Sequence, residues 1–379
     1  MNLLLVLGIS IVALAIGYFF YGRFIEKNFD VDGTHKTPAV EFEDGVDYVP
    51  THKIVIFGHH FASIAGGGPI IGPCVGLIFG FLPVWLWIII GTIFIGAVHD
   101  YSVLLASMRE KGRSVAEIAE KTLGRTGFLL FIGFTIIMLL MVTSVFLTLT
   151  TTALSSKYPV EFFGAGDLGI RTVVENGVTY AVIGGIASTS VIVITCCAPF
   201  LGYFLYKRKA NAWIMAIVAI AVCAISIEIG LMFPIKIDSF VWIVILSIYT
   251  IFAAGVPVWI VLQPRDFTNS FLLYGGVLAM LIGGFVLGFQ GATVDAPMLN
   301  LEVGAQHLGY VWPILFITVA CGAISGFHAL VAGGTTAKQV NFEKPDSRIV
   351  AYGGMSLEAL LAVMVIITIG CGISYDKLC

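Results

Sequence analysis

Six ionisable residues within apolar segments are the first candidates for chemistry in this sequence. They are His59, His60, His99, Asp100, Glu228 and His328. An ionisable side chain is costly in an apolar membrane segment, so such residues commonly mark functional sites. Imidazole titrates near neutral pH, and a neighbouring carboxylate adds a negative charge, so this group suits a proton or cation site. Imidazoles with one carboxylate also suit zinc or iron.

Each of these residues has an alternative interpretation. The sequence lacks the H-E-x-x-H spacing of metal-dependent hydrolases, and adjacent histidines rarely ligate one ion, so we expect no bound metal or other cofactor. His99 could serve only as an interface or capping residue, and Asp100 could pair with the basic loop at Arg109–Arg113. Glu228 lies near the end of its segment and could reach water. A membrane-embedded metal-dependent enzyme and a channel remain the alternative functions.

A glycine- and proline-rich stretch follows the first histidine pair. Residues 58–73 read GHHFASIAGGGPIIGP. Gly and Pro at membrane depth free backbone groups that a cavity, ion, water or neighbouring protein must satisfy, and transporters build binding sites at such breaks. Close packing of helices at small residues is the alternative. In a helical register His59, Ser63 and Gly66 share one face, as do Cys321, Ser325 and His328.

The composition places these residues in a membrane protein. The 379 residues are 58% hydrophobic and 11% charged, with a mean hydropathy of +0.99, whereas water-soluble domains carry about 25% charged residues. No basic stripe suited to nucleic acid is present. The seven cysteines include no C-x-x-C pair, and we interpret most of them as small core residues.

Hydropathy predicts an all-α polytopic fold with about ten transmembrane helices. The predicted spans are 2–21, 54–80, 83–107, 128–153, 180–206, 211–232, 239–262, 270–290, 313–334 and 349–372. We interpret the first span as a retained helix rather than a removed signal peptide. Spans 54–80 and 313–334 are interrupted by glycine, and span 239–262 has a lesser break at Ala253–Pro257.

The basic residues orient these spans. Sixteen of the twenty Lys and Arg residues fall in loops after odd-numbered spans, and the other four are Lys157, Arg171, Lys236 and Lys377. Basic residues are retained on the cytoplasmic side, so we expect both termini outside and the acidic loop 22–53 inside. Five of the six ionisable residues then lie in the cytoplasmic half, which predicts a common cavity. Glu228 is the exception.

Four segments resemble the carbon starvation protein (CstA) family of membrane transporters. They are FGHHFASIAGGGPIIGP at 57–73, GAVHDY at 96–101, PVWIVLQPRD at 257–266 and ACGAISGFHALVAGGTTA at 320–337. The resemblance covers about residues 50–365. It implies ion-coupled secondary uptake of short peptides or pyruvate across the cytoplasmic membrane, rather than enzyme activity. It also implies a LeuT-like fold of inverted five-helix repeats with discontinuous helices.

The resemblance implies a division of the chain and a set of site residues. Residues 1–52 would add a helix and the acidic loop, and 53–379 would form the core, with repeats at about 53–232 and 239–379. Only four predicted spans follow residue 239, so the second repeat would be incomplete. The expected substrate-binding residues are Ser63, Gly66, Gly67, Gly68 and Gly255. The expected residues for coupling to H⁺ or Na⁺ are His59, His60, Asp100, Ser325 and His328.

Overall fold

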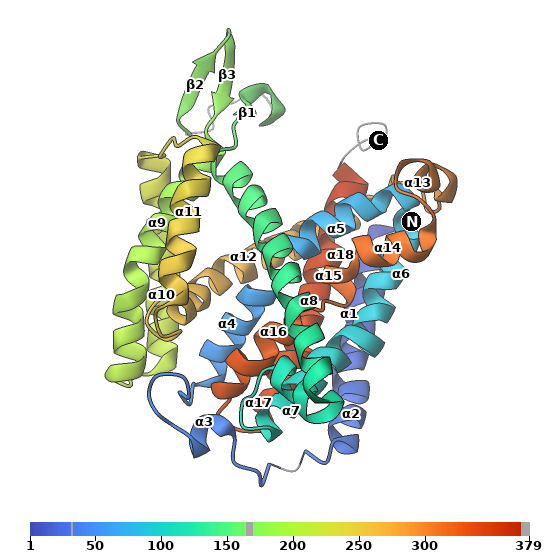
Figure 1. The fold of residues 1–379 in the computed structure, drawn as a ribbon. Coiled ribbons are helices and arrows are strands. Elements are labelled where there is room, and N and C mark those ends of the chain that lie inside the picture. The colour runs from blue at the N-terminus through green and yellow to red at the C-terminus, as the bar shows by residue number, and fades with distance from the viewer. Residues whose placement is uncertain (32, 164–169, 373–379) are drawn as a thin grey trace. The chain divides into compact units, whose positions relative to one another are not determined.

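The chain folds into two compact units of helices (Figure 1). The computed structural model describes residues 1–31, 33–163 and 170–372, so Lys377 and Cys379 lie outside the described residues. The first unit comprises Met1–Thr122 with Leu273–Cys379, and the second comprises Leu123–Leu272. At the boundary, Gly124 adopts a positive φ of 74° and kinks the long helix α8 (Val115–Leu154).

Within the described residues, seven helices are long and apolar enough to span a membrane. They are Leu3–Asn28, Phe81–Arg109, Val115–Leu154, Ile183–Lys207, Ala212–Met232, Leu262–Phe289 and Asp346–Gly372. Each coincides with one predicted span. An eighth span is a bent pair, Lys53–Ile64 with Gly68–Phe79, and α11 (Ser239–Ala254) is a shorter apolar helix. The described chain is therefore a mostly helical, polytopic membrane protein, as predicted.

The first unit contains the helices that carry the buried ionisable residues. Its helices before the unit boundary are α1 (Leu3–Ile16), α2 (Gly22–Asn28), α3 (Pro38–Glu41), α4 (Lys53–Ile64), α5 (Gly68–Gly76), α6 (Phe81–Gly91) and α7 (Ala97–Arg109). After residue 273 come the end of α12 (Leu262–Phe289), α13 (Leu301–His307), α14 (Val311–Thr318), α15 (Ala320–Ala323), α16 (His328–Leu330), α17 (Asp346–Arg348) and α18 (Gly354–Gly372).

Short π or 3-10 segments connect several of these helices. The π segments are η1 (Gly17–Tyr21), η3 (Thr92–Gly96), η6 (Val331–Thr335) and η8 (Ile349–Gly353), and the 3-10 segments are η2 (Leu77–Phe79) and η7 (Thr336–Lys338). π segments displace the side chains that follow them and are frequent at functional sites. Two of them, η3 and η8, directly precede helices that carry buried acidic residues.

The predicted break in span 54–80 is confirmed. α4 ends at Ile64, and α5 begins at Gly68 with Pro69 in its first turn, where a missing backbone N–H costs nothing. The two halves are bent by 42°. The intervening residues are Ala65, Gly66 and Gly67.

The predicted span 313–334 is not one helix. Its residues form α14, α15, α16 and η6, with residues 324–327 outside any helix. Gly333 and Gly334 have non-helical backbone angles, and Gly334 has a φ of 95°. Several glycines in one apolar segment therefore replaced a continuous span with a series of short turns.

Helix α18 is the centre of the first unit. It packs against α4, α5, α6 and α15, and twelve of its nineteen residues are buried. A helix that is apolar on all sides belongs in a core rather than on a surface. Side chains on the buried positions of α18 are consequently held away from both water and lipid.

The second unit pairs helices and carries a small sheet. α9 (Ile183–Gly202), η5 (Tyr203–Lys207) and α10 (Ala212–Met232) form a hairpin in which the Ser190 and Ser226 hydroxyls lie 2.8 Å apart. Ahead of them, the strands β1 (Tyr158–Pro159), β2 (Thr172–Glu175) and β3 (Val178–Ala181) pair antiparallel in the order β1-β3-β2; η4 (Val160–Phe163) lies within this segment. This sheet was not predicted, although Asn176-Gly177 is a typical hairpin turn.

The end of α11 and the start of α12 differ from the predicted spans. α11 ends at Ala254, within the predicted break. α12 begins at Leu262 rather than near residue 270, and Pro264 falls in its first turn, where helices tolerate proline.

Candidate functional site

Asp100 is the buried acid around which the site is built. It lies on α7, four residues after the π segment η3, and its side chain is fully buried. Its Oδ2 lies 2.7 Å from His328 Nδ1, and its Oδ1 lies 3.0 Å from His99 Nδ1. A buried carboxylate needs such partners because an unpaired charge is strongly unfavourable there.

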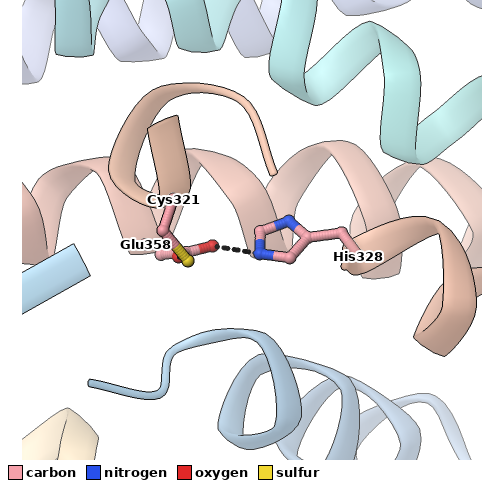
Figure 2. A group of neighbouring side chains, drawn as sticks. All are labelled: Cys321, His328 and Glu358. Carbon is pink, nitrogen blue, oxygen red and sulfur yellow. Dashed lines mark hydrogen bonds and ion pairs between the residues drawn. The ribbon is translucent and has the colours of Figure 1, made fainter. Parts of the chain in front are cut away.

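His328 joins Asp100 to a second carboxylate. It opens the three-residue helix α16 and is fully buried. Its Nε2 lies 3.2 Å from Glu358 Oε2 on α18, at ion-pair distance but without the alignment of a hydrogen bond. Figure 2 shows the imidazole and this carboxylate facing each other. The structure therefore places one imidazole between two buried carboxylates.

Glu358 is the site residue that the sequence analysis missed. It lies in the middle of the predicted span 349–372 and is fully buried. The rule that selected the six candidates applies equally to a lone glutamate in an apolar span, so this signal was present in the sequence. Tyr352 in η8 donates a hydrogen bond of 2.9 Å to the Ile93 carbonyl in η3, which ties together the two helices that carry Glu358 and Asp100.

Cys321 completes the group from α15. Its Sγ lies 3.8 Å from Glu358 Oε1 and 3.7 Å from Ser325 Oγ, and Figure 2 shows the thiol beside the Glu358 carboxylate. Cys321 and Ser325 approach each other as predicted, but residues 324–327 are not helical, so a shared helical face was the wrong reason. The interpretation of cysteines as small core residues does not describe Cys321, which contacts polar groups.

Three of these side chains could hold a metal ion. The donor atoms of Cys321, His328 and Glu358 all lie within 4.8 Å of one another. Thiolate, imidazole and carboxylate are the ligands of tetrahedral zinc sites, and the Asp100 carboxylate on the other ring nitrogen of His328 is a typical supporting contact. This group differs from the metal-site alternative considered for the sequence, which consisted of the histidines and one carboxylate.

The histidine pair on α4 is buried beside the same central helix. His59 and His60 are 1% and 0% exposed. His60 Nδ1 lies 3.1 Å from the Thr336 hydroxyl, and its ring faces Gly354, the first residue of α18. His60 thus reaches the helix of Glu358 one turn earlier. Ser63 lies one turn after His59 on α4 and is partly buried.

Small residues let α5 approach this group closely. A Cβ atom added at Gly68 would overlap the Cys321 side chain, and one at Gly72 would overlap the Thr318 carbonyl oxygen. Gly68 and Gly72 therefore allow close packing of α5 against its neighbours, which was the alternative considered for these glycines. It coexists with the break, because Gly68 is also the first residue of α5.

The structure decides some of the alternatives for single residues. Asp100 contacts His328 and His99 rather than the basic loop, and Arg109 instead lies 3.3 Å from Glu343. His99 contacts Asp100 directly and its side chain is 37% exposed, so it lies at the edge of the buried group. Glu228 is exposed on α10. Gly255 lies just after α11 in the second unit, and its part in substrate binding stays a prediction.

Comparison with known proteins agrees with the resemblance seen in the sequence. The family model described as "Carbon starvation protein CstA" matches residues 2–376. A "Peptide transporter CstA" from Bacillus subtilis (strain 168) is 37% identical over 374 residues, which is 97% of this chain and 58% of that protein. No solved structure matches the chain.

Two relatives from Escherichia coli (strain K12) carry different names. One is a "Peptide transporter CstA", 34% identical over 97% of this chain and 50% of its own length. The other is the "Pyruvate/proton symporter BtsT", 32% identical over 94% of this chain and 48% of its own length. The chain spans about half the length of the curated relatives it matches. These relatives are named as transporters rather than enzymes.

Proposed function

This chain belongs to the carbon starvation protein CstA family, and we propose that it takes up a short peptide or a small carboxylate such as pyruvate by proton-coupled secondary transport. The names of its relatives support both substrate classes, and one of them names the proton. The observation that carries the proposal is the buried Asp100–His328–Glu358 group. Ionisable groups buried within membrane spans are typical of proton relays in transporters.

Coupling follows from the charge that this group carries. With two carboxylates and a neutral imidazole, the group has a net charge of −2. Each proton that it takes up reduces the free-energy cost of burying this charge in the membrane. A carrier whose rearrangement requires the neutral group moves only after proton uptake. His99, Asp100, His328 and Glu358 form a continuous series of contacts of 3.0, 2.7 and 3.2 Å. Protons would enter it at the partly exposed His99.

Substrate binding is assigned to the break between α4 and α5. Gly66 and Gly67 lead into α5, which begins at Gly68 without a side-chain cap, and the N-terminus of α5 would face a substrate carboxylate. Ser63 and Gly255 are the other proposed contacts. Because Gly68 touches Cys321, a substrate at this break would lie within a few side chains of Glu358. Such proximity would couple substrate binding at the break to proton binding at Glu358.

The proposed architecture has about ten spans, namely an added first helix and a LeuT-like core of inverted repeats whose second repeat would be incomplete. The bent pair α4–α5 supports the first broken helix, and the end of α11 before Pro257 supports the second. Inverted repeats require that two such broken helices enter the membrane from opposite sides. The repeats would occupy about 53–232 and 239–379, after an added segment 1–52. Uptake would occur across the cytoplasmic membrane, with both termini outside.

Accumulation in proteoliposomes tests this function. We expect the reconstituted full chain to concentrate pyruvate or dipeptides when the pH outside is lower than inside, and saturation with substrate to distinguish a carrier from a channel. An imposed sodium gradient in place of the proton gradient provides the ion control. Failure to accumulate either substrate class under both gradients would remove the basis of the proposal.

A metal ion is the second candidate occupant of this site, favoured by the grouping of Cys321, His328 and Glu358. Such an ion would occupy the position proposed for the coupling proton. The membrane-embedded metal-dependent enzyme would then be the favoured alternative function. Elemental analysis of the purified protein separates the candidates. We expect less than one equivalent of zinc or iron per chain. One equivalent of either metal that is lost in the Cys321→Ser variant would favour the metal ion.

A further inference from the structure

A large cavity lies where the first membrane helix ends, away from the buried acidic group. Its volume is about 810 Å³. We call it the basic cavity. The lining residues come from α2, the segment after it and the residues around α17: Arg23, Glu26, Lys27, Asp30, Val31, Lys344, Pro345 and Arg348. Four of these side chains are positive and two are negative. A cavity with this excess of positive charge favours an anionic ligand.

The charges in the basic cavity are only partly matched by the protein. Glu26, which is 6% exposed, lies 3.1 Å from Arg348 Nη1 and 3.6 Å from Lys344 Nζ. Arg348 is 13% exposed and also stacks over the Tyr18 ring at 5.2 Å. Its Nη1 is thus paired with Glu26 at ion-pair distance, whereas its buried Nε has no hydrogen-bond acceptor in the described part of the chain. A nearly buried guanidinium whose Nε–H has no acceptor indicates that a further acceptor belongs here.

The position of the cavity relative to the membrane narrows the choice of ligand. Arg23 and Lys27 lie in the last two turns of the candidate span Leu3–Asn28. On the same span Phe19, Phe20 and Phe24 are 51%, 72% and 56% exposed, as expected for side chains that face lipid. The cavity therefore lies at the level where this span leaves the hydrocarbon, on the side that the basic residues assign to the cytoplasm. Lipid phosphates lie at this level.

We propose that the basic cavity binds a phosphate group, supplied by the headgroup of an anionic phospholipid. Arginine and lysine give phosphate oxygens short, charge-assisted hydrogen bonds, and basic pockets beside membrane helices are suited to anionic headgroups. Soluble phosphate shares this chemistry but would not use the exposed phenylalanines. A bound headgroup would join α2 to Arg348, which lies in the first turn of the span that carries Glu358. The proposal does not depend on transport activity.

Lipid binding to the purified full chain in detergent tests this site. The probes are phosphatidylglycerol, zwitterionic phosphatidylcholine and inorganic phosphate, with affinity measured by native mass spectrometry and thermal unfolding. The variant is Arg23→Gln/Lys27→Gln, because both side chains are exposed and their replacement should not unfold the protein. The matched control, Lys36→Gln/Lys209→Gln, also removes two exposed basic residues, but none that lines the cavity.

We expect the wild-type protein and the control to prefer phosphatidylglycerol over phosphatidylcholine. In the Arg23→Gln/Lys27→Gln variant its affinity should fall about 10- to 30-fold, as expected for two basic residues at a lipid surface. Inorganic phosphate that binds as tightly as the lipid, and is lost in the same variant, would assign the site to soluble phosphate. Equal binding of both lipids, or an unchanged affinity in the variant, would overturn the proposal.

Discussion

At the scale of single residues, the site is a series of ionisable groups in contact rather than separate polar positions. Asp100, His328 and Glu358 are fully buried, whereas His99, at the edge of the series, is partly exposed. Each group compensates for the burial of its neighbour, since an isolated charge in this environment is strongly unfavourable. Removing one member should therefore change both coupling and stability, and the two effects can be measured separately.

Asp100→Asn should uncouple transport while keeping much of the hydrogen bonding. The amide has nearly the shape of the carboxylate but cannot carry its charge. We expect gradient-driven accumulation to fall at least about tenfold, as for a lost charge-assisted contact of 1.5–3 kcal/mol, with substrate exchange between equal concentrations preserved. Asp295→Asn is the matched control because this aspartate is exposed. Unchanged accumulation in Asp100→Asn would exclude this residue from coupling.

His328→Ala should destabilise the fold because it leaves two buried carboxylates without the imidazole between them. We expect a loss of about 3–5 kcal/mol, the usual cost of breaking a buried ion pair on one side. Adding Glu358→Gln should recover part of that loss, because one of the two carboxylates is then neutral. Thermal unfolding in detergent measures both, with the exposed His307→Ala as control. A double variant less stable than His328→Ala would contradict the proposed charge balance.

At the scale of elements, hydropathy was a good guide to the spans but not to their internal breaks. Continuous apolar runs predicted seven single helices and the bent pair α4–α5. The segment 313–334 is equally apolar, yet glycines divide it into short turns that hydropathy does not register. His328 was therefore predicted at a suitable depth, but its contact with Asp100 depends on the fold of residues 324–327, which no local pattern specifies.

The glycines of α5 should be required for packing as well as for the break. Gly72→Ala places a methyl group against the Thr318 carbonyl, and we expect a loss of about 1–3 kcal/mol from overpacking. Gly276→Ala on α12 is the matched control, because nothing lies within 4 Å of the added atom. Thermal unfolding should show a lower melting temperature for Gly72→Ala alone. Equal melting temperatures would mean that α5 does not pack as closely as described.

At the scale of the whole molecule, the distribution of loop charges and the position of the buried charges both support a proton-coupled transporter. The basic residues predict which loops face the cytoplasm, and the ionisable groups of the spans predict where coupling occurs. The family was recognisable because its glycine-rich and histidine-containing segments are distinctive. Glu358 was not predicted because a single charge in an apolar span was passed over. The basic cavity was not predicted because its lining residues meet only in the folded chain.

The predicted orientation can be tested with inserted epitope tags. A tag at the Asn176-Gly177 turn should react with antibody added to intact spheroplasts, because this hairpin lies in a loop predicted outside. A tag after Lys209 should react only after the membrane is permeabilised. The reverse pattern would invert the topology and move the buried acidic group to the outer half of the membrane.

The most direct test of the central claim is substrate-driven proton movement in proteoliposomes that contain a pH-sensitive dye. Adding pyruvate or a dipeptide outside, without an imposed gradient, should acidify the lumen of liposomes that contain the wild-type chain. Asp100→Asn should abolish this signal, and Asp295→Asn should preserve it. Substrate entry without acidification in the wild-type chain would contradict proton coupling by the Asp100–His328–Glu358 group.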